Sequence, residues 1–117
     1  MSDEQAGKRG RQAAMEWVAK AYQAHMKHDL EQAIALYTQS IEIFPTAEAY
    51  TFRGWARSNQ KDYAGAIQDC HEAIDLDPEF GNPYNDIGAY YLEQGELDEA
   101  IPWLHMALKA KRYENYC

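Results

Sequence analysis

The chain has 117 residues, the size of one small domain, and its 19 acidic residues outnumber its 11 basic residues, giving a formal charge of −8. This charge repels a phosphate backbone, so no nucleic-acid partner is expected. No stretch approaches the ~20 apolar residues of a transmembrane helix, and the first residues are polar, so we expect no membrane partner, no secretory signal and a cytoplasmic location.

The first predicted segment, residues 1–13, is a flexible polar tail. It contains glycine and a basic cluster of Lys8, Arg9 and Arg11, a composition typical of a solvated arm. We expect the folded domain to occupy residues 14–117.

From residue 14 onward the sequence repeats with a period of 33 to 34 residues. Positions one period apart match in size: one column is aromatic, the next small, and a third always alanine. The three columns are Trp17, Tyr50 and Tyr84; Ala21, Gly54 and Gly88; and Ala33, Ala66 and Ala100. Such a period with helical spacing inside it predicts a solenoid of helix pairs, with units at about 14–46, 47–80 and 81–114.

Each unit is predicted to contain two helices separated by a tight turn. In the third unit, Tyr84, Ile87 and Tyr91 fall on one face of a first helix, and a second helix begins near Leu97. Gly95 between them suits a positive φ at a helix end. The equivalent turns lie at 27–29 and 59–62. The predicted fold class is therefore all-α, with about six helices and a short C-terminal tail.

The repeat resembles the tetratricopeptide repeat. The matching residues in the third unit are the run 84–91, Leu97, Ala100 and Ala107; in the second they are Tyr50, Gly54, Tyr63, Ala66, Ala73, Asp77 and Pro78. The resemblance implies a right-handed superhelix of antiparallel helix pairs, whose first helices line a concave groove for a peptide or a partner's helix. Arg53 and Arg57 depart from the pattern, and we expect their stems to cover apolar surface while the guanidinium groups reach water.

The predicted peptide-binding groove is the stripe of the first helices that faces away from the packing columns, with Tyr22, Trp55 and Asn85 as its anchors. Its members are Val18, Tyr22, His25 and Met26; Thr51, Trp55, Ser58 and Asn59; and Asn82, Asn85, Ala89, Leu92 and Glu93. Tyr22 and Trp55 have a second interpretation, in which they simply pack against the neighbouring helix.

Some members of the family grip the acidic tails of heat-shock chaperones with Lys, Asn and Arg side chains. The corresponding positions here are Val18, Tyr22, Phe52, Asn82 and Asp86, and none of them matches. Asp86 has the opposite charge, so we do not expect a two-carboxylate clamp. A neutral or basic peptide is the favoured partner.

No nucleophile elbow, phosphate loop or zinc motif occurs, so we expect no enzyme, no cofactor and no metal. His25 and His28 lie three residues apart, but two imidazoles are too few for a metal site. The sequence predicts a non-catalytic interaction module or scaffold. The alternative is a small chaperone that shields an apolar segment of a secreted or assembling partner, and it would need more exposed apolar residues in the groove.

The last repeated helix leaves apolar residues that a further repeat would cover. They are a candidate self-association surface: Trp103, Leu104, Leu108, Tyr113 and Tyr116. Three possibilities are open: the tail folds back as a short cap, the surface pairs with another copy, or the chain is a fragment of a longer array.

Overall fold

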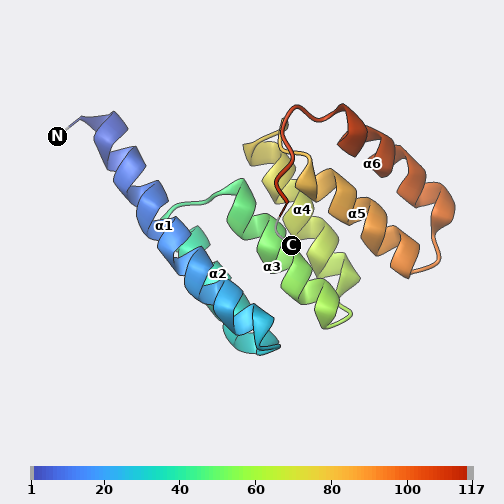
Figure 1. Cartoon of the computed structure of the whole chain (residues 1–117), viewed down its shortest axis with the longest axis horizontal. Helices are drawn as coiled ribbons and strands as arrows, with labels where there is room; N and C mark the ends of the chain where they lie inside the picture. The colour runs from blue at the N-terminus through green and yellow to red at the C-terminus, as the bar shows by residue number, and fades with distance from the viewer. Residues whose placement is uncertain (1, 116–117) are drawn as a thin grey trace.

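The computed structural model describes residues 2–115 and folds them into six α-helices joined by short turns (Figure 1). The helices are α1 (Asp3–Met26), α2 (Leu30–Ile43), α3 (Ala47–Asn59), α4 (Tyr63–Leu76), α5 (Asn82–Glu93) and α6 (Leu97–Lys109). They pack as three sequential pairs, with α2 against α3 and α4 against α5. The predicted all-α helical repeat solenoid is confirmed.

The turn inside each pair is built in the same way three times. His28, Lys61 and Gly95, one period apart, have φ values of 63°, 67° and 79°, the left-handed conformation that ends a helix. Asp29 and Asp62 follow the first two and accept hydrogen bonds from backbone N–H groups of α2 and α4. The repeat therefore encodes one turn geometry, even where a non-glycine residue must adopt a positive φ.

The N-terminal segment differs from the expected flexible tail, because α1 continues through residues 3–13. Ser2 caps the helix by accepting a hydrogen bond from the Gln5 N–H at 3.2 Å. Further along, Gly10 packs against the ring of Phe44, and Arg11 pairs with Glu48 at 2.7 Å. Gly10 and Arg11, which we expected in a solvated tail because of their polar surroundings in the sequence, therefore contact the α2–α3 connection and α3.

Glycines at the repeated small column let helices of a pair approach closely. A Cβ atom on Gly54 would lie 2.9 Å from the carbonyl oxygen of Ala66 in α4, closer than real Cβ contacts. On Gly88 it would collide with the side chain of Leu104 in α6. The Ala66 carbonyl belongs to the backbone of α4 and cannot move aside, whereas the Leu104 side chain can change its conformation. A larger residue should therefore be tolerated less well at Gly54 than at Gly88.

Arg53 and Arg57 are half-buried, and their guanidinium groups do not simply extend into water as expected from the sequence. Both guanidinium groups turn toward the buried carboxylate of Asp69 on α4. Arg53 donates two hydrogen bonds to it, at 3.0 and 2.8 Å, and Arg57 donates one at 3.1 Å. Both side chains turn this way because Asp69 lies opposite them across the α3–α4 contact. Among residues 2–115, Asp69 forms ion pairs with these two arginines only.

Among residues 2–115, no helix is both long and apolar enough to cross a membrane. The same residues contain no group of three or more His, Cys, Asp or Glu side chains placed to hold a metal ion.

Candidate functional site

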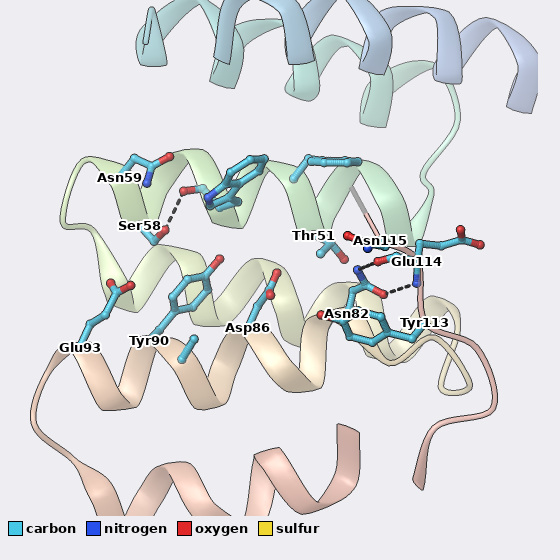
Figure 2. Close-up of a pocket in the computed structure, with 13 residues that line it drawn as sticks. Thr51, Ser58, Asn59, Asn82, Asp86, Tyr90, Glu93, Tyr113, Glu114 and Asn115 are labelled. Carbon is cyan, nitrogen blue, oxygen red and sulfur yellow. Dashed lines mark hydrogen bonds between the residues drawn. The ribbon is translucent and has the colours of Figure 1, made fainter. Parts of the chain in front are cut away.

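A groove opens between α3 and α5, the first helices of the second and third pairs. The two helices contact each other, α1 contacts α3 on the other side, and the cavity between α3 and α5 measures about 270 Å³ (Figure 2). Its lining residues are Thr51, Phe52, Trp55, Ser58 and Asn59 from α3; Asn82, Asp86, Ala89, Tyr90 and Glu93 from α5; and Tyr113, Glu114 and Asn115 after α6. We call this cavity the α3–α5 groove.

The structure divides the predicted groove residues into two sets. Those that line the α3–α5 groove are Thr51, Trp55, Ser58, Asn59, Asn82, Ala89 and Glu93. Those outside its lining are Val18, Tyr22, His25, Met26, Asn85 and Leu92. The second set includes every predicted residue of α1: Val18, Tyr22 and His25 pack against α2 and α3, and Met26 is exposed at the end of the helix. The predicted anchors Tyr22 and Trp55 pack together, with ring centroids 6.5 Å apart.

His25 is a buried core residue that supports the groove from behind. Its Nδ1 accepts a hydrogen bond from the Tyr37 hydroxyl at 3.1 Å, and its Nε2–H donates to the Asn59 side-chain oxygen at 2.8 Å. This arrangement fits the neutral imidazole, and burial lowers the pKa of His25. The network fixes Asn59, which lines the groove, to α1 and α2.

Asp86 and Tyr90 are absent from the predicted groove stripe, although they lie at the centre of the groove (Figure 2). Asp86 was considered only as a position of the rejected two-carboxylate clamp. With Asn82 and Glu93, Asp86 and Tyr90 follow helical spacing on one face of α5, rotated from the stripe through Asn85 and Leu92. That spacing was available in the sequence, but the packing columns alone did not fix the rotation of the helix. Burial raises the pKa of Asp86 to about 7, against a slight opposing effect of the Asn85 side chain.

Residues 110–115, which we call the post-α6 segment, turn back from α6 toward the groove (Figure 1). The Gly81 N–H donates to the Arg112 carbonyl at 2.7 Å, and the Arg112 N–H donates to the Glu79 carbonyl at 3.1 Å. Two residues later, the Asn82 side chain donates to the Glu114 carbonyl at 2.7 Å and accepts from the Glu114 N–H at 2.9 Å (Figure 2). Extended backbone therefore lies across one end of the groove.

Side-chain contacts also hold the post-α6 segment in place. Arg112 donates two hydrogen bonds of 2.8 Å to Asp77, and its guanidinium lies 4.7 Å from the centre of the Phe80 ring. At Gly81, a Cβ atom would come within 2.9 Å of Ala110 and 3.1 Å of the Arg112 carbonyl oxygen. Glycine at this position permits the close approach of the two backbones.

The candidate self-association residues separate in the structure. Trp103 and Leu104 turn inward: Trp103 packs against Tyr84 of α5 and His71 of α4, and Leu104 against Gly88 of α5. Leu108 is 84% exposed, and Tyr113 lines the α3–α5 groove. Tyr116 lies outside the described residues. The inward turn follows from helical spacing, since residues 100, 103, 104 and 107 share the face of α6 that meets α5.

Family models described as tetratricopeptide repeat match this chain at residues 13–47, 47–80 and 84–112. Mouse sperm-associated antigen 1 is 32% identical over 92 residues, which is 79% of this chain and 10% of the relative. Small glutamine-rich tetratricopeptide repeat-containing protein 2 of Saccharomyces cerevisiae is 38% identical over 74 residues, 62% of this chain and 21% of the relative. The chain thus spans about a fifth or less of these two curated relatives.

Solved structures share the fold. The second tetratricopeptide domain of Spaghetti (RPAP3), bound to the HSP90 peptide SRMEEVD, superposes with a TM-score of 0.80 at 24% identity, covering 92% of this chain and 99% of that one. The TPR2B domain of yeast Sti1, in a pHsp70 complex, has a TM-score of 0.77 at 28% identity. This second match covers 80% of this chain and 76% of the other.

Proposed function

The chain belongs to the tetratricopeptide-repeat family, and we propose that it binds an extended segment of a partner protein in the α3–α5 groove. The comparisons support a protein-interaction scaffold. The relatives are far longer than this chain, so the partner is argued from the groove itself.

One observation carries the proposal: the groove already holds extended polypeptide. The Asn82 amide pairs with both backbone groups of Glu114, as one peptide group pairs with another in a β-ladder. Such a pairing does not depend on the side chain of the bound residue, so it accepts any extended backbone. Specificity must then come from the side chains that line the rest of the groove.

The post-α6 segment and a partner peptide would compete for Asn82. An intramolecular segment acts at a high effective concentration, so it lowers the apparent affinity of any competing peptide. We therefore expect the intact chain to bind more weakly than a chain from which the segment has been removed.

A binding experiment in trans tests the proposal. A chain shortened to end at Lys109, checked for helicity by circular dichroism, is titrated with an acetylated peptide of residues 110–115. We expect saturable binding that is lost with Asn82→Ala, because the alanine side chain cannot pair with backbone. Gln68→Ala, an exposed amide on α4 remote from the groove, is the matched control and should bind normally. Absence of binding by the folded, shortened chain would contradict the proposal.

The chaperone alternative has less support from the groove lining. Met26 and Leu92 are exposed, but neither lines the α3–α5 groove, whose lining includes the polar side chains of Asp86, Asn82 and Thr51. An apolar client segment would leave these polar groups without partners, which is unfavourable. An extended peptide with polar backbone contacts fits better.

Self-association is a second candidate function, favoured by the exposed apolar stripe on α6. Leu97, Ile101 and Leu108 lie on it and are all exposed, while the post-α6 segment turns away toward the groove. We expect light scattering at rising concentration to detect a dimer, and Ile101→Glu with Leu108→Glu to remove it by placing charge in the contact. A monomer at all concentrations would eliminate this candidate.

A further inference from the structure

We propose that Asp86 and Tyr90, at the centre of the α3–α5 groove, form a recognition subsite for one lysine or arginine side chain of the bound polypeptide. This inference rests on the proposed function, since it needs a peptide in the groove. Backbone pairing by Asn82 does not distinguish one bound side chain from another. Asp86 and Tyr90 would provide this specificity.

The first observation is that Asp86 has no positive partner. None of the ion pairs among residues 2–115 includes it. The other acid of this region, Asp69, is compensated by both Arg53 and Arg57. An acid that is removed from water without a counter-charge is costly to ionise, and a ligand cation would offset that cost.

The second observation, independent of the first, is the Tyr90 hydroxyl. Tyr90 is only 4% exposed, it lines the groove, and its buried hydroxyl oxygen makes no hydrogen bond of ordinary geometry among the described residues. The nearby hydroxyl of Ser58 lowers the pKa of Tyr90 slightly against the effect of burial, but it donates its own hydrogen to the Trp55 carbonyl, so it does not donate to the Tyr90 oxygen. Buried polar atoms in native proteins are nearly always paired, so an orphan facing a binding groove points to a ligand. Its oxygen accepts a hydrogen bond from an ammonium or guanidinium group.

The two acceptors lie close enough to influence each other. The charge of Asp86 contributes to raising the pKa of Tyr90, after the larger effect of burial. A lysine ammonium has three donors and an arginine guanidinium has five, so either group can satisfy both acceptors at once. The aromatic ring of Trp55 lines the same cavity and offers a further favourable surface for a cation.

The post-α6 segment leaves this subsite without a cation. Its arginine, Arg112, is held outside the groove by Asp77 and Phe80, and Glu114 supplies a carboxylate at the groove's edge. The segment therefore occupies the backbone site at Asn82 and not the charge site at Asp86. An acidic ligand such as SRMEEVD, the peptide in the related structure, would bring like charge to Asp86.

Matched peptides test the subsite on the intact chain. Eight-residue Ala/Ser peptides carry a single lysine at successive positions, and each has one partner with norleucine and another with glutamate at that position. We expect one lysine peptide to bind roughly tenfold more tightly than its norleucine partner, because a desolvated hydrogen bond to a charged group is stronger than one between neutral groups. The glutamate peptide should be the weakest of the three.

Variants separate the subsite from general attraction to an acidic protein. Asp86→Asn keeps the side-chain shape and should abolish the lysine preference, while Glu93→Gln, an exposed acid in the same groove, should keep it. Tyr90→Phe should reduce it. A lysine preference that is equal in wild type and Asp86→Asn overturns the inference, as does equal binding of the lysine and norleucine peptides. In the latter case, loss of all binding with Asn82→Ala would leave the proposed function intact, whereas no binding of any peptide overturns both.

The pH dependence gives a second readout. A bound cation pairs with ionised Asp86, whose pKa in the free chain is about 7, so binding releases a proton and strengthens as pH rises. At pH 6 about one molecule in eleven is ionised and at pH 8 about ten in eleven, which predicts a roughly tenfold gain for the lysine peptide. The titratable groups that interact with Asp86 are Tyr90 on α5 and Cys70 on α4, and Glu93 and Glu114 line the same groove. Asp69, which also acts on Cys70, is compensated by Arg53 and Arg57. Cys70 and Tyr90 stay protonated, since burial raises the pKa of both. Asp86→Asn should remove the gain.

Discussion

Replacing Asp69 by alanine should lower the free energy of unfolding by about 3–5 kcal/mol, a large part of the stability of a small domain. The carboxylate is almost fully buried, and its loss leaves the guanidinium groups of Arg53 and Arg57 without their partner between α3 and α4. A buried charge that loses its partner keeps the full cost of its removal from water. Urea unfolding followed by circular dichroism measures the change directly.

Two further variants identify the cause of that loss. Asp69→Asn keeps a hydrogen-bond acceptor and should fall between wild type and alanine. A triple variant with Arg53→Met, Arg57→Leu and Asp69→Leu should recover most of the stability, because an apolar replacement of a whole buried ion cluster is often neutral or stabilising. A loss below 1 kcal/mol in Asp69→Ala would mean that water reaches the arginines and that the cluster is effectively exposed.

Tyr37→Ala should destabilise the first half of the molecule by a similar amount, about 3–5 kcal/mol. Tyr37 is fully buried on α2, with its ring stacked on Phe52 of α3 at 5.8 Å and its hydroxyl donating to His25 of α1. Removing the ring opens a cavity where three helices meet, and it also frees one nitrogen of the buried imidazole. Equilibrium unfolding of the alanine variant gives the magnitude.

Tyr37→Phe is the matched control for this site. It keeps the ring and removes only the hydrogen bond to His25, so we expect a loss of about 1–3 kcal/mol, the cost of leaving a buried acceptor unpaired. Since His25 also holds Asn59, the phenylalanine variant should slightly weaken peptide binding in the α3–α5 groove without a change in helix content. Equal stability of the alanine and phenylalanine variants would show that the cavity contributes little.

The repeat itself was readable from the sequence because its signals are local. Helical spacing, the period of 33 to 34 residues and the turn residues each depend on neighbours within a few positions, and they gave six helices and the positive φ of Gly95. The groove residues of α3, such as Thr51 and Trp55, followed from the same spacing. On α5 the predicted stripe and the groove lining differ, because one position along a helix is a rotation of about 100°, which separates Asp86 from Asn85.

Other features depended on contacts between distant parts of the chain. The sequence does not show that Asp69 would meet Arg53 and Arg57, because these residues lie on different helices and pair only once α3 and α4 pack. It also assigned residues 1–13 to a polar tail, although α1 begins at Asp3, because the residues that contact Gly10 and Arg11 lie more than thirty positions further along. Pairing over such separations is set by packing and not by composition.

By itself, then, the sequence determined the family, the helix pairs and the acidic character of the surface, because all three are written in periodicity and residue type. Only the tertiary structure decided that the post-α6 segment lies in the groove and that Asp86 stands there without a counter-charge. The path of an irregular segment is fixed by the surface it meets, here Gly81 and Asn82. The charge state of an acid depends on the groups that surround it in space. No local sequence pattern encodes the path of the segment or the charge state of Asp86.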